Sequence, residues 1–271
     1  MAIHHKILGV ATLLYLLIFF LHILYFSVKK ERILSVTWIT IYGTFCIHTL
    51  GLVLRWIESY RMDIGHVPLA NFYESLIFFA WSVTLVLIIM RRKIPYPVIT
   101  MCASTASLFL MGYASISPSV EKSIQPLIPA LQSNWLHIHV VTCFLAYSAF
   151  VISFICGALY FITWEGVVPP KETLDDINYR SVIIGFPMLS LGILTGAVWA
   201  HYAWGSYWSW DPKETWSLIT WIIYALFLHA RLVRGWRKRR IALISIIGFM
   251  SVIFTYFGVN IILSGLHSYA T

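Results

Sequence analysis

The segment Trp204–Trp216, WGSYWSWDPKETW, combines four tryptophans with one tyrosine and three charged residues in a stretch of 13. It separates two long apolar segments and is too polar to join either of them. Large aromatic side chains gathered in one loop can bind a flat, largely apolar molecule by stacking and by burying its surface. The alternative is a belt of Trp and Tyr at a membrane interface, but no other connection gathers as many aromatic residues.

The charged residues of this segment fit the start of a helix. Asp211 is placed as the N-cap, Pro212 as the first helical residue and Glu214 three residues after the cap. This interpretation explains both acidic side chains without catalysis.

Haem is a flat, largely apolar molecule whose iron needs axial ligands, and histidine is the commonest of these. The ten histidines therefore test whether haem is the ligand. In the segment NWLHIHVV, His137 and His139 are about 200° apart on a helix and cannot share a face. His139 lies on a stripe of small residues of the kind that faces neighbouring helices, made of Thr142, Ala146, Ser153 and Gly157.

The C-terminal segment GVNIILSGLHSYAT returns His267 to the same side of the membrane as His139. If the last helix continues, His267 shares a face with Tyr256 and Asn260. We expect His139 and His267 to flank the tryptophan loop as axial ligands. The alternative for each one is a solvated side chain at the interface.

Histidine inside an apolar span is costly and indicates function. His22 in the first span and His229 in the seventh lie at similar depths, about 22 Å and about 18 Å below the outer helix ends. We expect them to face one another as a second pair. His48 in the second span has no equally deep partner, and a hydrogen bond to a neighbouring helix is its alternative. Four external histidines are interpreted as interfacial: His4, His5, His66 and His201.

The composition assigns the chain to a membrane, because 59% of its 271 residues are hydrophobic and only 11% are charged. A helix needs about 20 apolar residues to cross a bilayer core of about 30 Å. Stretches near that length recur eight times, which predicts an all-α polytopic bundle forming a single domain over residues 1–271. The predicted spans are about 7–28, 33–57, 69–90, 94–114, 135–163, 181–203, 217–233 and 241–263.

The basic residues predict the orientation of this bundle. Eight spans put both termini on one side, and 14 of the 19 Lys and Arg residues fall in connections on the other side. By the positive-inside rule that side is cytoplasmic, so both termini and the tryptophan loop face outward. The net charge of +8 is thus explained without a nucleic-acid partner. On the outer side, Arg55, Arg61 and Lys213 are candidates to pair with haem propionates, and snorkelling to the interface is the alternative.

The four cysteines lie in apolar stretches without paired CxxC spacing, so neither a disulfide framework nor a zinc site is indicated. We interpret Cys46, Cys102, Cys143 and Cys156 as small buried hydrophobic side chains. No soluble domain, repeat or low-complexity tail is expected, so any chemistry belongs to the bundle or to a partner.

These motifs together resemble a known family. WGSYWSWDPKETW, followed by ITWIIYALFLHAR and GVNIILSGLHSYA, is similar to the CcsA (ResC) proteins of cytochrome c biogenesis, which belong to the WWD-domain haem-handling superfamily. The segments RWIESYRMDIGHVPLANFYESLIFFAWS and LQSNWLHIHV resemble the same family. The similarity extends from about Arg55 to the end, and it is weaker in the first span around His22. The five motifs occur in the family's order.

The resemblance implies a binding site for haem b, iron protoporphyrin IX, at the WWD loop 204–216. It assigns His139 and His267 as outer axial ligands and His22 and His229 as an inner pair through which haem passes outward. The loop residues it assigns to the haem site are Trp204, Trp208, Trp210 and Asp211.

The same resemblance implies the haem-binding subunit of a system II cytochrome c synthase, or haem lyase. Haem is presented there for thioether attachment to the CxxCH segment of apocytochrome c, with CcsB (ResB) as the membrane partner. His201 and a short cytoplasmic loop at Gly166–Arg180 depart from the chloroplast members. The short loop favours a bacterial plasma membrane over a thylakoid membrane.

Two alternatives stay open. CcmC and CcmF, haem-handling proteins of the other bacterial maturation system, share the tryptophan core but are less similar in the DPKETW and GLHSY segments. A polytopic transporter or a quinone-binding subunit, whose aromatic loop only marks the membrane interface, belongs to a different class. A haem spectrum that is lost when His139 and His267 are replaced by alanine would distinguish these classes.

Overall fold

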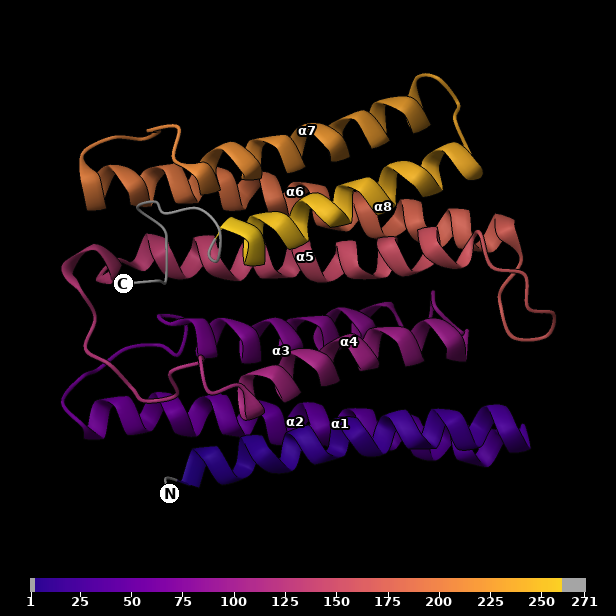
Figure 1. Ribbon diagram of the computed structural model, residues 1–271, viewed down its shortest axis with the longest axis horizontal. Helices are drawn as coiled ribbons and strands as arrows, with labels where there is room; N and C mark the ends of the chain where they lie inside the picture. The colour runs from indigo at the N-terminus through magenta and orange to yellow at the C-terminus, as the bar shows by residue number, and fades with distance from the viewer. Residues whose placement is uncertain (1–2, 260–271) are drawn as a thin grey trace. The chain divides into compact units, whose positions relative to one another are not determined.

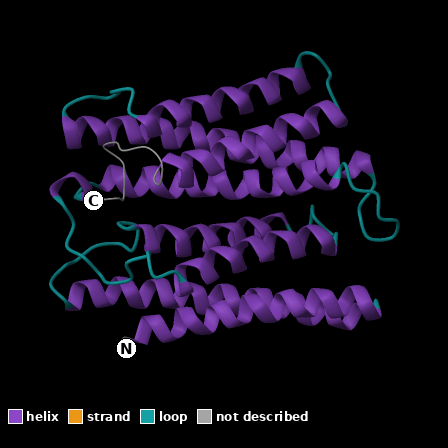
Figure 2. Cartoon of the chain, viewed as in Figure 1, coloured by secondary structure: helices purple, strands orange, loops and turns teal. Residues whose placement is uncertain are grey.

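The computed structural model describes residues 3–259, and Figures 1 and 2 show that the described part is built from helices. Eight of these helices are long and apolar enough to cross a membrane, which confirms the predicted all-α polytopic architecture. The chain divides into two compact units, unit 1 over residues 1–127 and unit 2 over residues 128–271. The expectation of a single haem-handling domain stays a prediction.

Unit 1 is a closed bundle of four helices. It contains α1 (Ile3–Val28), α2 (Glu31–Arg61), α3 (Phe72–Met90) and α4 (Pro97–Ile116). α1 packs on α2 and α4, and α3 packs on the same two helices. The buried residues of α1 recur at helical spacing, which gives that helix one inward face: His4, Leu8, Ala11, Tyr15, Ile18 and His22.

A chain of buried polar contacts joins all four helices of unit 1. The Tyr15 hydroxyl of α1 lies 3.2 Å from Nδ1 of His48 on α2 and 2.7 Å from Oγ1 of Thr84 on α3. The Thr84 hydroxyl lies 3.4 Å from the hydroxyl of Ser107 on α4. For His48 the structure confirms the alternative interpretation, a hydrogen bond to a neighbouring helix.

Unit 2 is a second closed bundle. It contains η1 (Pro129–Leu131), α5 (Asn134–Leu159), α6 (Lys171–Trp204), α7 (Pro212–Leu232), α8 (Arg239–Ile253) and the π turn η2 (Phe254–Gly258). α5 packs on α6 and α8, and α7 packs on the same two helices. On α5, Ala146 is fully buried and Ser153 donates to Oδ1 of Asn178 on α6 at 2.7 Å. The small-residue stripe of α5 therefore faces its neighbours, as predicted.

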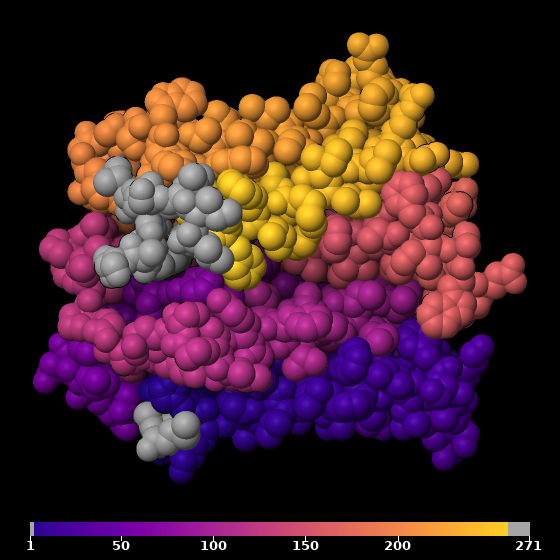
Figure 3. All heavy atoms as spheres, viewed as in Figure 1, coloured from indigo at the N-terminus to yellow at the C-terminus, as the bar shows by residue number. Residues whose placement is uncertain are grey.

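The start of α6 differs from the prediction. The helix begins at Lys171, ten residues before the predicted span. Its first turns are helical because they pack inside unit 2, where Asp175 forms an ion pair with Arg231 of α7. The connection between α5 and α6 therefore comprises residues 160–170 in place of the expected Gly166–Arg180, and it protrudes from the end of unit 2 (Figure 3).

The cysteines are only partly as expected. All four are free thiols, and Cys143 and Cys156 are buried. Cys46 is exposed on α2, so its interpretation as a buried side chain is wrong. On a helix that crosses a membrane an exposed thiol contacts lipid, where a small apolar side chain costs little.

Candidate functional site

The end of the tryptophan-rich loop is fixed by a capping box at the start of α7. Oδ2 of Asp211 accepts a hydrogen bond from the Lys213 amide at 3.0 Å, and Oε2 of Glu214 accepts one from the Asp211 amide at 3.2 Å. Glu214 also accepts from the Ser209 amide at 2.7 Å. This confirms the predicted N-cap and shows why α7 begins at Pro212, five residues before the predicted span. Asp211 and Glu214 thus shape the loop from buried positions.

The loop itself carries its aromatic side chains in pairs. α6 ends at Trp204 because Gly205 adopts a left-handed conformation with φ of 76°. The Trp204 ring meets Trp199 edge to face at 4.8 Å, and Trp208 meets Trp210 in the same way at 5.8 Å. Trp210 is 68% exposed, so the loop presents an aromatic surface to its surroundings.

His139 on α5 lies beside this loop and against α6. Its Nδ1 is 2.7 Å from the carbonyl oxygen of Gly192, and its ring stacks on Trp199 at 5.9 Å and 20°. The Trp199 indole donates from Nε1 to the carbonyl of Ala130 at 2.8 Å. The structure thus brings His139, Trp199 and Trp204 together in unit 2.

Trp199 is the site residue that the sequence reasoning missed. Trp199 lies inside an apolar span and not in the tryptophan loop, so the aromatic content of its surroundings does not mark it as a site residue. Its spacing from Gly192 and Gly196 places all three on one face of α6, and that periodicity is the signal that could have found it.

The Gly192 carbonyl fixes the protonation of the His139 ring. A carbonyl oxygen only accepts, so Nδ1 carries the proton, and in the neutral imidazole Nε2 then keeps its lone pair. Metal-bound histidines commonly donate their second ring nitrogen to a carbonyl in this way. In this tautomer the lone pair on Nε2 of His139 can bind iron, as an axial ligand must. His267, the predicted second ligand, and Asn260 lie outside the described residues.

His22 on α1 has the same arrangement inside unit 1. It is completely buried, and its Nδ1 lies 2.9 Å from the carbonyl oxygen of Ile18. Its Nε2 has no hydrogen-bond partner within the described residues 3–259. His229 belongs to unit 2, so the pairing of His22 with His229 stays a prediction.

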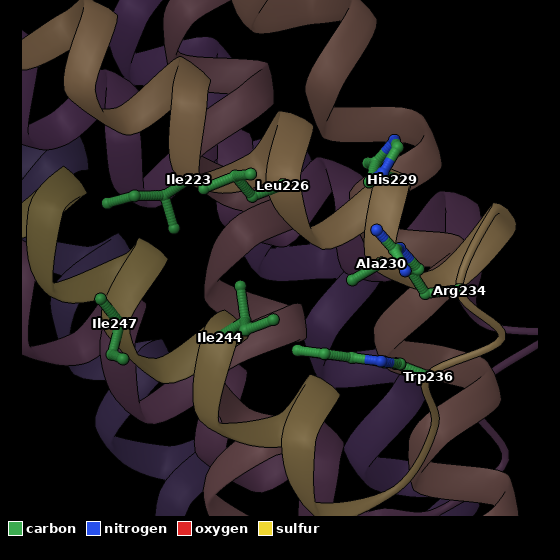
Figure 4. Close-up of a pocket in the computed structure, with 8 residues that line it drawn as sticks. All are labelled: Ile223, Leu226, His229, Ala230, Arg234, Trp236, Ile244 and Ile247. Carbon is green, nitrogen blue, oxygen red and sulfur yellow. The ribbon is translucent and has the colours of Figure 1, made fainter.

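A cavity of about 540 Å³ opens between α7 and α8. Figure 4 shows that His229, Arg234 and Trp236 line the cavity. The other lining side chains are apolar: Ile223, Leu226, Ala230, Ile244 and Ile247. The volume falls in the range of about 300–1,000 Å³ that is usual for small-molecule sites. One imidazole and one guanidinium at an apolar cavity fit a largely apolar molecule that carries a carboxylate and a metal atom.

The turn beside this cavity is fastened by a carboxylate of α6. Oδ2 of Asp175 pairs with the Arg231 guanidinium, and its Oδ1 accepts from the Lys238 amide at 2.9 Å. Both side chains of the ion pair are more than 90% buried. Asp175 therefore joins the ends of α7 and α8 to α6 next to the cavity.

Arg55, a candidate propionate partner, is engaged within unit 1. Its side chain is 1% exposed and donates to Glu74 Oε1 at 2.8 Å, to the Lys122 carbonyl at 3.0 Å and to the Ser123 carbonyl at 3.2 Å. Arg55 thus anchors the connection that follows α4. The other two candidates differ in position, since Arg61 is exposed and Lys213 is half-buried.

Two histidines interpreted as interfacial are buried instead. His4 is 3% exposed with its Nε2 3.3 Å from the Arg55 guanidinium, and His66 is 4% exposed with its Nε2 3.0 Å from the Gln125 carbonyl. The interfacial interpretation is wrong for both, because the connections of unit 1 fold over its helix ends and cover them. His201, by contrast, is exposed and stacks on Tyr207 at 4.2 Å.

A family model described as "Cytochrome C assembly protein" matches residues 69–267. The chain belongs to this family. The match covers the tryptophan loop, His139, His229 and the C-terminal histidine, and it confirms the family resemblance seen in the motifs.

Relatives named "Cytochrome c biogenesis protein CcsA" are similar over most of the chain. The protein of Synechococcus sp. (strain CC9902) is 38% identical, over 97% of this chain and 95% of the relative. That of Guillardia theta is 40% identical, over 82% of this chain and 81% of the relative. That of Chlamydomonas reinhardtii is 43% identical, over 81% of this chain but 64% of the longer relative.

One solved structure also has a similar fold. The protein titled "Cytochrome c Heme Lyase CcmF" aligns with a TM-score of 0.74 over 94% of this chain, at 18% identity. The chain spans 46% of that protein's length. At this identity the likeness concerns the fold alone.

Proposed function

We propose that this cytochrome c assembly protein binds haem b and presents it at the tryptophan loop for covalent attachment to apocytochrome c. The observation that carries the proposal is the hydrogen bond from His139 to the Gly192 carbonyl, 2.7 Å long, beside Trp199 and Trp204. It leaves Nε2 of His139 as an iron ligand next to aromatic side chains on which a porphyrin can stack. His267 supplies the second axial ligand, and Trp208 and Trp210 extend the aromatic surface.

We also propose His22 and His229 as the inner ligand pair. The buried Nε2 of His22 and the apolar cavity at His229 support a second ligand pair, through which haem reaches the outer site. Arg234 at the same cavity has the charge that a propionate requires. This route agrees with the eight apolar helices of a multi-pass membrane protein.

The chemistry is thioether formation on the substrate haem. Each cysteine thiol of an apocytochrome CxxCH segment adds across one vinyl group, so that sulfur bonds to one vinyl carbon and the proton ends on the other. The substrate brings its own nucleophiles and its own histidine, so this chain contributes mainly by positioning. A CcsB-type membrane protein is the partner that supplies the outer domain.

The orientation follows from the charges. Basic residues concentrate in the connections that the positive-inside rule assigns to the cytoplasm, so the tryptophan loop and both termini face outward. We assign the chain to a bacterial plasma membrane, with the loop on the extracytoplasmic side.

Absorption spectra of the chain purified with its CcsB-type partner test the proposal. The wild type should carry protoporphyrin haem with a six-coordinate, low-spin spectrum, and His139→Ala should weaken or lose that spectrum. His137→Ala is the matched control, because His137 is two residues away and about 200° around the same helix. A colourless wild type from haem-replete cells, or equal loss in both variants, would refute the proposal and favour a transporter or a quinone-binding subunit.

A further inference from the structure

The face of α6 that meets His139 is made of two glycines, Gly192 and Gly196, and the aromatic side chain of Trp199. Gly192 accepts the hydrogen bond from Nδ1 through its carbonyl, and Trp199 stacks on the ring. Between them, a Cβ placed on Gly196 would lie 2.6 Å from Nδ1 and 2.8 Å from Cε1 of His139. Contacts below 3.0 Å are essentially never made by real Cβ atoms. The imidazole therefore occupies the space that any side chain at position 196 would need.

The ring has no easy way to avoid such a side chain. Its Nδ1 is held by the Gly192 carbonyl, and its stacking partner Trp199 is held in turn by the carbonyl of Ala130. One helix turn earlier, a Cβ on Gly192 would lie 2.5 Å from Sγ of Cys143, so α5 and α6 are in close contact here. Moving the His139 ring means breaking the carbonyl contact or the stack.

We propose that Gly192, Gly196 and Trp199 form a cradle on α6 that positions His139 and sets its tautomer. These three residues do not ligate iron, and their effect on ligation acts through His139. The carbonyl of Gly192 selects the form with the proton on Nδ1, the missing side chain of Gly196 admits the ring, and Trp199 fixes the ring plane. The inference rests on the proposed role of His139 as a haem ligand, and it adds the residues that make that ligand effective.

Replacing Gly196 by alanine tests the cradle. Because Gly196→Ala displaces the ring, we expect haem affinity to fall by about 10- to 100-fold, the usual effect of losing an outer-shell partner of a metal ligand. The ferric low-spin signal in electron paramagnetic resonance should also change its anisotropy, because the imidazole plane turns. Gly112→Ala on α4 is the matched control, since a Cβ there meets nothing within 4 Å.

A measurement without haem decides the tautomer independently. In the haem-free, ¹⁵N-histidine-labelled complex, nuclear magnetic resonance should show the His139 ring protonated on Nδ1, with its signals assigned from His139→Ala. Gly196→Ala should give a mixture of the two tautomers, and Gly112→Ala should leave the wild-type pattern. Unchanged His139 signals and unchanged haem affinity in Gly196→Ala would overturn the cradle, even if His139→Ala loses haem.

A second pair of variants covers the case in which Gly196→Ala does not fold. Trp199→Phe keeps an aromatic ring and should retain most of the low-spin signal, whereas Trp199→Ala should reduce it together with the single-tautomer pattern of His139. Equal behaviour of the two variants would refute the positioning role of Trp199. If His139→Ala itself binds haem like the wild type, the proposed ligand is wrong, and the haem-free spectra still decide the cradle.

Discussion

Breaking the Arg55–Glu74 ion pair should cost far more than breaking a pair on the surface. Nε of Arg55 lies 2.8 Å from Oε1 of Glu74, and the two side chains are 1% and 0% exposed. Glu74→Ala leaves a buried guanidinium without its counter-charge and also removes the acceptor of the Ala70 amide, 2.8 Å away. Removing one partner of a buried pair costs about 3–5 kcal/mol, so we expect a loss of that size in the free energy of unfolding.

The chain offers a matched control in unit 2. Nε of Arg180 lies 2.6 Å from Oδ2 of Asp176, but these side chains are 48% and 52% exposed. Asp176→Ala should therefore cost only about 0.3–0.5 kcal/mol, the value of an exposed pair one helical turn apart. Both variants are compared by denaturant titration of the purified protein in the same detergent.

A double replacement separates charge burial from packing. Arg55→Met with Glu74→Leu removes both charges and fills most of their volume, so it should be more stable than Glu74→Ala alone. The reasoning is refuted if Glu74→Ala unfolds as easily as Asp176→Ala, or if the double variant is the least stable of the three.

Asp211→Ala should lower the free energy of unfolding by about 0.5–2 kcal/mol because it removes a helix cap, whereas Asp211→Asn should retain most of it; equal losses would contradict the capping role seen at the Lys213 amide. Asp175→Ala should speed tryptic cleavage in the turn 233–238, because the ion pair to Arg231 and the acceptor of the Lys238 amide are both lost; an unchanged cleavage rate would show that the carboxylate does not fasten this turn. Gly248→Ala should cost about 1–3 kcal/mol by overpacking, because its Cβ would lie 2.8 Å from the Tyr224 ring, which stacks on Phe150 at 3.6 Å; Gly43→Ala, where a Cβ meets nothing within 4 Å, is the control, and equal stability of the two would argue against tight packing at Tyr224.

The features that the sequence predicted well are those that depend on neighbours within a few turns. The eight spans follow from apolar runs of bilayer length, and the cap of α7 follows from Asp211, Pro212 and Glu214, which are adjacent in the chain. The inward face of α5 follows from small residues at helical spacing. Each of these patterns lies within one short segment, so these features can be predicted without knowledge of the tertiary fold.

The features that sequence reasoning missed depend on contacts between distant segments. Arg55 bonds to the carbonyl of Lys122, 67 residues away, and Trp199 bonds to that of Ala130, 69 residues away. Nε2 of His66 lies 3.0 Å from the carbonyl oxygen of Gln125, 59 residues away. Because backbone carbonyls belong to every residue type, nothing in the sequence marks which ones will be the partners. Such contacts become visible only once the connections have folded over the helix ends.

The hydroxyl of Tyr15, shared between His48 and Thr84, helps to fix the position of α1 along α2 and α3. Apolar side chains gain little by exchanging lipid for one another, so packing alone scarcely opposes the sliding of one helix along its neighbours. A slide by one turn, about 5.4 Å, would separate Tyr15 from both partners where no water can replace them. His22 follows Tyr15 on the same face by seven residues, or about 10.5 Å at 1.5 Å per residue. The Tyr15 contact therefore helps to set the position along the bundle of His22 Nε2, which has no hydrogen-bond partner among the described residues.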